Sequence, residues 1–244
     1  MQPEDDPDPE WVARLSGRSV GSARRALTEA AGETRLFRHI AREHGREGRR
    51  SYVEIDAPLE LHALVRLTRP RHVVEVGVSS GVSSAYVLAA LRKNRRGTLH
   101  SIDLPSFERP RRGRARPPLH SWSLPSGRST GWAVPPGLRR GWDLRLGDKR
   151  ELLPVLSDEL PRIDLVVYDV PHEDAATYRE FAAVDRRLPP NGIAIADHGP
   201  GGGLCGALRR WARRRDSTAV GRTGLGLYGF RAGKRPKVPR SGPA

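Results

Sequence analysis

One stretch of the chain, residues 73–85, constrains its fold more than any other. It runs Val-Val-Glu-Val-Gly-Val-Ser-Ser-Gly-Val-Ser-Ser-Ala and continues as an Ala/Leu-rich run to Leu91. The apolar residues around Glu75 predict a buried strand, and Gly77 and Gly81 predict a tight turn before a helix. A strand, a glycine turn and a helix N-terminus together place backbone N–H groups where they can bind a nucleotide.

The spacing of the two glycines separates two classes of nucleotide ligand. A dinucleotide site needs G-x-G-x-x-G, in which the second glycine lets the backbone approach a pyrophosphate. Here the glycines are spaced G-x-x-x-G, and Ser79 occupies that close-approach position. Glu75, two residues before Gly77, would also repel a phosphate. The pattern therefore favours a cationic or zwitterionic ligand without phosphates, and S-adenosylmethionine is such a ligand.

A second acid supports a nucleoside site. The strand predicted at 98–103 ends in Asp103, about 20–25 residues after the turn, where a carboxylate commonly meets a ribose. A carboxylate can accept hydrogen bonds from both ribose hydroxyls. An Asp at a strand end is equally typical of a residue that caps the next turn. Taken with Glu75 and the two glycines, Asp103 indicates nucleoside binding.

Strand and helix patterns alternate along most of the chain, which predicts a parallel, doubly wound sheet. We place strands near 72–77, 98–103, 142–146, 163–169 and 191–197, and helices near 81–93, 148–158, 174–188 and 204–215. Residues 217–222 and 224–231 flank a glycine turn, as two antiparallel strands would.

Residues 60–231 resemble a class I S-adenosylmethionine-dependent methyltransferase of the O-methyltransferase-like branch. The resemblance rests on the order and spacing of VVEVGVSSGVSS (73–84), SIDLP (101–105), GWAVP (131–135), LGDKRELLP (146–154), IDLVVYDVPH (163–172) and PNGIAIADH (190–198). It implies an α/β fold with a Rossmann-like sheet that is mainly parallel and ends in an antiparallel C-terminal hairpin.

The chain divides into four expected regions. We expect a disordered tail over residues 1–21, which begins acidic and proline-rich, and a helical extension over 22–55 with a break near Gly32. The methyltransferase domain is expected over 56–231, beginning with a helix at 57–67. A basic tail without fixed structure is expected over 232–244. The N-terminal helices could cover the sheet, close over the substrate or join two copies of the chain.

Residues 104–140 form a connection too long for an ordinary strand–helix loop. They carry many Arg, Pro, Ser and Gly residues, but Trp122 and Trp132 favour partial order because an exposed indole is costly. The connection leaves the carboxyl edge of the second strand, where ligands bind in open α/β sheets. We interpret it as a lid over the substrate, with an inert insertion as the alternative.

The resemblance implies a set of cofactor-binding residues. Glu75 and the backbone of the glycine turn would hold the methionine end, Asp103 the ribose, and Asp148 the adenine amino group. Asp148 is also a favourable N-cap for the helix that starts after it. The expected cofactor-binding residues are Glu75, Gly77, Ser79, Gly81, Ser83, Asp103, Leu104 and Asp148.

Two strand ends carry the candidate catalytic groups. Asp169 and His172 follow the fourth strand, and a histidine with a pKa near 6.5 suits a general base at neutral pH. Asp197 and His198 end the fifth strand. In the catechol-type branch of the family two acids and an Asn bind magnesium; here Asp169 and Asp197 match the acids, and His198 replaces the Asn. Histidine would better suit manganese, iron or zinc, while Asp197 and His198 could instead orient the substrate.

The charge of the chain raises a second interpretation. The net charge is +15 and the pI is about 11.1, and all but four of the 43 basic residues are arginine. The arginines are dispersed, so we expect non-specific nucleic-acid binding at most. The sequence Asp169-Val170-Pro171-His172 also lacks the Asp/Asn-Pro-Pro-aromatic pattern of enzymes that methylate base amino groups.

We therefore expect an enzyme that methylates the hydroxyl of a small molecule. An RNA methyltransferase and a catalytically silent S-adenosylmethionine-binding module that assembles with a partner protein remain as alternatives. One cysteine, Cys205, permits no internal disulfide, and no apolar run approaches the roughly 20 residues of a membrane span. These features predict a cytoplasmic protein without a membrane partner, with the N-terminal helices as a candidate homodimer contact.

Overall fold

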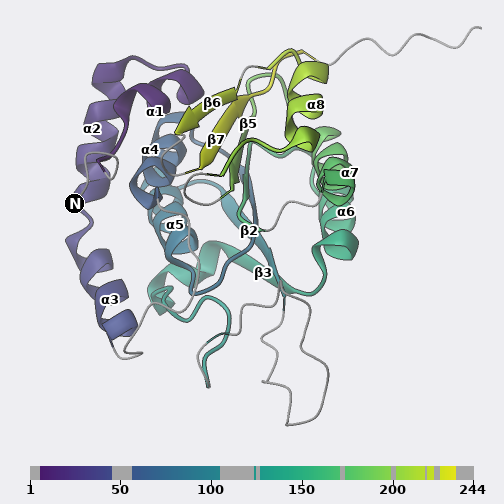
Figure 1. The fold of residues 1–244 in the computed structure, drawn as a ribbon. Coiled ribbons are helices and arrows are strands. Elements are labelled where there is room, and N and C mark those ends of the chain that lie inside the picture. The colour runs from purple at the N-terminus through teal and green to yellow at the C-terminus, as the bar shows by residue number, and fades with distance from the viewer. Residues whose placement is uncertain are drawn as a thin grey trace, which may run out of the picture.

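The predicted doubly wound sheet is present in the computed structural model, which describes residues 6–45, 57–104, 124, 127–170, 174–198, 202–217, 219–222 and 226–234. Its strands are β1 (His72–Val76), β2 (Thr98–Asp103), β3 (Trp142–Leu146), β4 (Leu165–Tyr168), β5 (Ile193–Asp197), β6 (Ala219–Arg222) and β7 (Leu227–Arg231). They form one sheet in the order β3-β2-β1-β4-β5-β7-β6 (Figure 1). β1 to β5 pair in parallel, whereas β7 is antiparallel to β5 and β6, which confirms the expected C-terminal hairpin.

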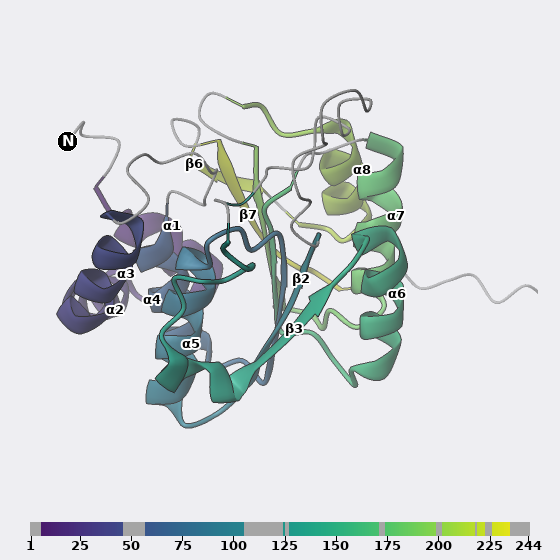
Figure 2. The same ribbon diagram turned by 90° about the horizontal axis from the view of Figure 1, so that it is seen from below.

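Helices cover both faces of the sheet (Figures 1 and 2). They are α1 (Pro9–Ser16), α2 (Val20–Ala31), α3 (Thr34–Gly45), α4 (Pro58–Thr68), α5 (Val82–Asn94), the 3-10 helix η2 (Pro136–Gly141), α6 (Lys149–Glu159), α7 (Asp174–Asp185) and α8 (Gly206–Arg214). α4 and α5 lie on one face, α2 packs outside α4, and α1 packs against α2, α4 and the strands β6 and β7. α6, α7 and α8 lie on the other face.

Alternation along the strands builds two apolar cores, because successive side chains of a strand point to opposite faces. Val73 and Val167 belong to the core beneath α4 and α5. Val74 and Val166 belong to the core beneath α6, α7 and α8. A parallel sheet covered by helices on both sides is apolar on both faces.

The first predicted region is wrong for part of its length. Residues 1–21 were expected to form a disordered tail, yet α1 lies within them and α2 begins at Val20. Asp8 caps α1 by accepting hydrogen bonds at 2.9 Å from the backbone N–H groups of Glu10 and Trp11, and Pro9 occupies the first helical position. Trp11 is buried, and its indole N–H donates to the Val220 carbonyl oxygen at 2.8 Å.

The expected C-terminal tail starts slightly too early. Asn191 N–H donates to the Ala232 carbonyl oxygen at 2.7 Å, and Ala232 N–H donates to the Gly192 carbonyl oxygen at 2.8 Å. Ala232 is also buried. These bonds continue the pairing between β5 and β7 beyond the end of β7, so residues 232–233 belong to the folded domain. Residues 235–244 lie outside the described residues.

The long connection between β2 and β3 is described only in part. Residues 127–135 pack on the glycine turn and η2 packs on α5. Trp132 is buried, in agreement with the expected partial order, whereas Trp122 lies outside the described residues. Residues 105–123 and 125–126 also lie outside them, so the lid stays a prediction. No helix in the described ranges is long and apolar enough to cross a membrane.

Candidate active site

The glycine turn between β1 and α5 needs both of its glycines. Gly77 and Gly81 have φ values of +92° and +91°, a region that side-chain-bearing residues rarely adopt. A Cβ at Gly77 would collide with the carbonyl oxygen of Asp169. A Cβ at Gly81 would lie 2.7 Å from Val134 Cγ2. The turn is therefore closely packed against the end of β4 on one side and against residues 131–134 on the other.

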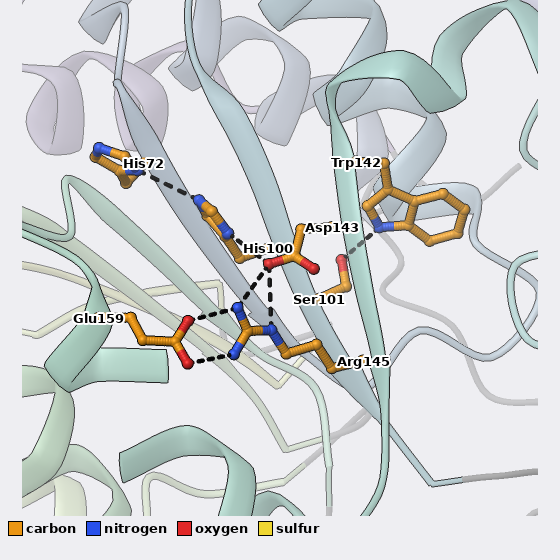
Figure 3. Close-up of polar contacts among 7 residues, drawn as sticks. All are labelled: His72, His100, Ser101, Trp142, Asp143, Arg145 and Glu159. Carbon is orange, nitrogen blue, oxygen red and sulfur yellow. Dashed lines mark hydrogen bonds and ion pairs between the residues drawn. The ribbon is translucent and has the colours of Figure 1, made fainter. Parts of the chain in front are cut away.

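Glu75 is buried beneath this turn and is bonded by three serine hydroxyls. Ser83 donates to Oε1 at 2.6 Å, while Ser84 and Ser101 donate to Oε2 at 2.6 and 2.7 Å. The indole N–H of Trp142 donates to Ser101 Oγ at 2.8 Å, which extends the network to β3 (Figure 3). Burial raises the pKa of Glu75, and the three hydroxyl bonds oppose that rise. Glu75 thus ties β1, β2 and the start of α5 together.

Asp103 ends β2 and turns its carboxylate toward the glycine turn. Oδ2 accepts the Ser79 N–H at 3.0 Å, and Oδ1 accepts the Leu104 N–H at 2.8 Å. The first bond links Asp103 to the expected cofactor loop, and the second is the turn cap that the sequence also allowed. Burial raises the pKa of Asp103, against the backbone N–H bonds that lower it.

Asp148 is the N-cap of α6. Its carboxylate accepts the Arg150 N–H at 2.8 Å and pairs with the Arg150 guanidinium at 2.6 Å. The hydrogen bond from the Arg150 side chain is the largest influence that lowers the pKa of Asp148. The capping interpretation is confirmed. A contact between Asp148 and adenine stays a prediction.

The end of β4 brings Asp169 to the glycine turn. Asp169 N–H donates to the Val76 carbonyl oxygen at 2.8 Å, and its own carbonyl faces Gly77. The second candidate catalytic residue, His172, lies outside the described residues. The structure therefore places Asp169 next to the glycine turn, whereas the position of His172 stays a prediction.

Asp197 and His198 lie at the end of β5. Asp197 is buried opposite Leu227 of β7. His198 Nε2 accepts the Cys205 N–H at 3.2 Å, its ring meets Tyr228 edge-on, and burial lowers its pKa. No set of three His, Cys, Asp or Glu side chains in the described residues is arranged to hold a metal ion. Asp169, Asp197 and His198 are all described, so they do not form such a set by themselves.

Sequence reasoning missed a buried polar cluster behind the fourth strand. Lys149 Nζ donates to the Tyr168 hydroxyl at 2.6 Å and forms an ion pair with Glu180 at 2.8 Å. The Tyr168 hydroxyl also donates to Glu180. The cluster joins the start of α6, the end of β4 and α7 next to Asp169. A tyrosine at the end of an apolar strand was the signal in the sequence.

A second feature that the sequence did not reveal is the wall formed by residues 127–135. Gly131 N–H and Ala133 N–H donate to the carbonyl oxygens of Ser79 and Ser80, each at 2.9 Å. His44 Nε2 lies 3.1 Å from Ser80 Oγ at the end of α3. The connection and the N-terminal extension therefore both contact the glycine turn.

A further polar network runs across β1, β2 and β3. His72 Nδ1 lies 3.3 Å from His100 Nε2, and His100 Nδ1 lies 3.1 Å from Asp143 Oδ2 (Figure 3). Arg145 joins Asp143 to Glu159 of α6. His72 opens β1, so the network begins at the amino edge, opposite the glycine turn. We assign it to the packing of β3 and α6 on the sheet.

A family described as a methyltransferase domain matches residues 74–198. A methyltransferase from Geobacter sulfurreducens is 20% identical, covers 82% of this chain and 87% of its own, and has a TM-score of 0.53. The Podospora anserina methyltransferase PaMTH1, solved with S-adenosylhomocysteine, is 15% identical with coverages of 82% and 88% and a TM-score of 0.53. No curated protein sequence matches the chain.

A third similar structure is the O-methyltransferase TomG from Streptomyces achromogenes, which is involved in tomaymycin synthesis and was solved with S-adenosylmethionine. It is 18% identical, with coverages of 86% of this chain and 90% of its own and a TM-score of 0.50. At these identities the structures agree with the fold described above.

Proposed function

Because this chain belongs to the methyltransferase domain family, we propose that it is an S-adenosylmethionine-dependent O-methyltransferase that acts on a small-molecule hydroxyl. The observation that carries the proposal is the bond from Ser79 N–H to Asp103, which closes the glycine turn onto the carboxyl end of β2. Ligands of open α/β sheets bind at this edge.

The residues at this edge fit the proposed cofactor. Asp103 offers carboxylate oxygens to ribose hydroxyls, and the N-cap of α5 is Gly81, which has no side chain to bond the first N–H groups of the helix. The buried carboxylate of Glu75 near the turn disfavours a phosphate. Two of the similar structures, TomG and PaMTH1, were solved with S-adenosylmethionine and S-adenosylhomocysteine.

Bound S-adenosylmethionine would supply the methyl group: the acceptor oxygen would bond to the methyl carbon while the bond from that carbon to the positively charged sulfur breaks, and S-adenosylhomocysteine would leave. The chain's own task is to align the acceptor and to remove its proton. Asp169, held against Gly77 by the end of β4, orients the acceptor hydroxyl. His172, three residues further on, takes the hydroxyl proton. The Lys149–Tyr168–Glu180 cluster fixes the end of β4 directly before Asp169.

Calorimetry tests the cofactor assignment. We expect S-adenosylhomocysteine to bind with roughly micromolar affinity and NAD to show none comparable. Asp103→Ala should weaken S-adenosylhomocysteine by roughly 1–3 kcal/mol, because the ribose hydroxyls lose their acceptor. Asp158→Asn, which alters an exposed carboxylate on α6, is the matched control and should bind normally. Correctly folded protein that gives no heat with either sulfur ligand would refute the assignment.

Methyl transfer tests the catalytic residues. Labelled cofactor is offered with a panel of small phenols, alcohols and metabolite extracts, and the labelled product is recovered. His172→Gln should lower turnover roughly 10²–10⁴-fold while the affinity for S-adenosylhomocysteine is retained. The wild-type rate should rise with pH through a pKa near 6–7, as the histidine loses its proton. Full turnover by His172→Gln would remove His172 from the mechanism.

A further inference from the structure

Two histidines and an aspartate form a row across the first three strands, starting at the amino edge of the sheet. His100 of β2 pairs in register with Asp143 of β3 and with Val74 of β1, so these side chains share one face of the sheet. His72, two residues before Val74, lies on the same face. His72 Nδ1 is 3.3 Å from His100 Nε2, and His100 Nδ1 is 3.1 Å from Asp143 Oδ2 (Figure 3). The row thus brings two imidazole nitrogens together, with a carboxylate behind one of them.

Asp143 determines which nitrogen of His100 carries a proton. Burial raises the pKa of the Asp143 carboxyl, but the bonds from His100 and Arg145 outweigh burial and hold that pKa below its usual value. An ionised carboxylate only accepts hydrogen bonds, so His100 Nδ1 is the donor, and Nε2 of the neutral ring keeps a lone pair. A carboxylate behind an imidazole is the arrangement that orients histidines which bind metal ions in proteins.

The distance between the two imidazole nitrogens suits a tetrahedral metal ion. Two nitrogens bound to Zn²⁺ at about 2.0–2.1 Å, with a tetrahedral angle between them, lie roughly 3.3–3.4 Å apart. The 3.3 Å between His72 Nδ1 and His100 Nε2 falls in this range, whereas it is long for a hydrogen bond. Square-planar coordination would bring neighbouring nitrogens to roughly 2.9 Å, so the geometry favours zinc over Cu²⁺ or Ni²⁺.

The pair is open to solvent and in the form that binds metal. The Asp143 side chain is 37% exposed and His72 is half-buried, so water reaches the row. Burial and the neighbouring His100 lower the pKa of His72, and Asp164 opposes them. His72 is therefore neutral at pH 7, and a neutral imidazole is the ligand that a metal ion requires.

Two arginines beside the pair are matched by carboxylates, so they do not leave the row with uncompensated positive charge. Arg145 lies 3.0 Å from Asp143 Oδ2 and 2.7 Å from Glu159 Oε2. Arg162 forms an ion pair with Asp164. Asp164 also accepts two backbone N–H groups at the start of β1, which places its negative charge next to the row. This distribution of charge is compatible with a bound cation.

We propose that His72 Nδ1 and His100 Nε2 bind one zinc ion, with Asp143 holding His100 in position and water completing the tetrahedron. Two protein ligands are compatible with the finding that no set of three suitable side chains lies within the described ranges, and they should bind zinc more weakly than a four-ligand structural site. His72 Nδ1 gives up its proton on binding, and the ring then carries its proton on Nε2. The ion would join β1 to β2 and stabilise the fold. The inference is independent of the proposed methyl transfer.

Zinc affinity is measured on metal-free protein by competition with a chromophoric chelator, and we expect one ion per chain. Asp143→Asn should weaken zinc roughly 10–100-fold, as expected for a residue behind a metal ligand, and His72→Asn and His100→Gln should each weaken it further. His39→Asn on α3 is the matched control, because the His39 ring meets Arg42 instead of a second imidazole. Excess zinc should raise the melting temperature of wild type and His39→Asn, but not of His72→Asn.

A measurement on the unaltered protein covers the case in which a variant does not fold. Diethyl pyrocarbonate modifies neutral imidazoles, and mass spectrometry locates the modified residues. Zinc should slow the modification of His72 and His100 without changing that of His39. Zinc that protects neither residue of the pair, binding that survives both His72→Asn and His100→Gln, or an equal loss in His39→Asn would each overturn the inference.

Discussion

At the scale of single residues, the candidate site depends on a few positions where only one side chain fits. Gly77 combines a positive φ with direct contact to the backbone of Asp169. Glu75 is surrounded by hydroxyl donors, so its carboxylate orders the turn from beneath. A change at either position would alter the packing at the carboxyl edge of the sheet, where the cofactor and the acceptor are proposed to meet.

We expect Gly77→Ala to damage the site. The new Cβ would collide with the Asp169 carbonyl oxygen, and the alanine would have to adopt an unfavourable φ. The unfolding free energy should therefore fall by about 1–3 kcal/mol or more. Affinity for S-adenosylhomocysteine should fall with it. Gly137→Ala on η2, where a Cβ meets no neighbouring atom, is the control and should stay within about 0.5 kcal/mol of wild type. Urea unfolding and calorimetry on both variants measure the effects, and wild-type values for Gly77→Ala would contradict the packing argument.

The sequence predicted the place of single residues correctly where the backbone conformation determines which residue type fits. Gly77 and Gly81 could be assigned to the turn, and Asp103 to the end of a strand, because glycine spacing and a strand-end acid report backbone geometry. The partners of Glu75 could not be assigned, because Ser101 reaches it only through the pairing of β1 with β2. The contact of residues 127–135 with the turn could not be assigned for the same reason, since the bond from Gly131 N–H to the Ser79 carbonyl oxygen joins distant parts of the sequence.

At the scale of elements, α1 closes the edge of the sheet that carries the hairpin. Gly229 of β7 leaves room for Leu15 and Trp11, since a Cβ there would collide with both side chains. The Trp11 indole also donates to the backbone of β6. This contact links the first helix to the last strands of the chain, and so holds the two ends of the described chain together.

We expect Trp11→Ala to destabilise the protein by about 3–5 kcal/mol, because it empties a buried site. Trp11→Phe keeps much of the packing but loses the hydrogen bond to Val220, so it should cost less than Trp11→Ala. Phe37→Ala on α3 removes a side chain that is 62% exposed and should be nearly neutral. Thermal and urea unfolding of the three variants give the comparison, and a neutral Trp11→Ala would show that α1 is not part of the folded unit.

The elements themselves were predicted well because helix and strand periods are local. The strands at 98–103 and 142–146 match β2 and β3, and the break near Gly32 falls between α2 and α3. The prediction of a disordered tail was wrong because it rested on the acidic, proline-rich composition of residues 1–10. Within that stretch, Asp8 is an N-cap and Pro9 is the first residue of α1. The apolar residues Trp11 and Leu15 then bury against β7, a contact that composition does not report.

At the scale of the whole molecule, the strand order brings the site together. β1 lies between β2 and β4, so the carboxyl ends of these two strands place Asp103 and Asp169 on either side of the glycine turn. The helices of the two faces then hold that edge from both sides. Stability of either core is therefore a condition for the site, and a buried histidine on α4 tests this dependence.

His62 on α4 is that group. Its side chain is fully buried, and neither ring nitrogen has a hydrogen bond within the described residues. Burial lowers the pKa of His62 to about 4, helped by the positive charges of Lys93 and Arg66 and opposed by Glu33 and Glu29. The folded protein therefore holds this histidine neutral at pH values where an exposed histidine would be protonated.

The sign of the pH effect follows from the two pKa values. The unfolded chain binds a proton at His62 near pH 6.5, whereas the folded chain binds it only near pH 4. As the pH falls from 6.5 to 4, the unfolded state gains a proton that the folded state lacks, so the unfolding free energy decreases by up to about 3 kcal/mol. The contribution is fully present above pH 6.5 and lost below pH 4. His62→Leu should abolish this part of the acid sensitivity, because leucine does not titrate. Urea unfolding of wild type and His62→Leu at pH 7.5, 5.5 and 4.5 measures the difference, and parallel losses in both proteins would show that other groups govern acid unfolding.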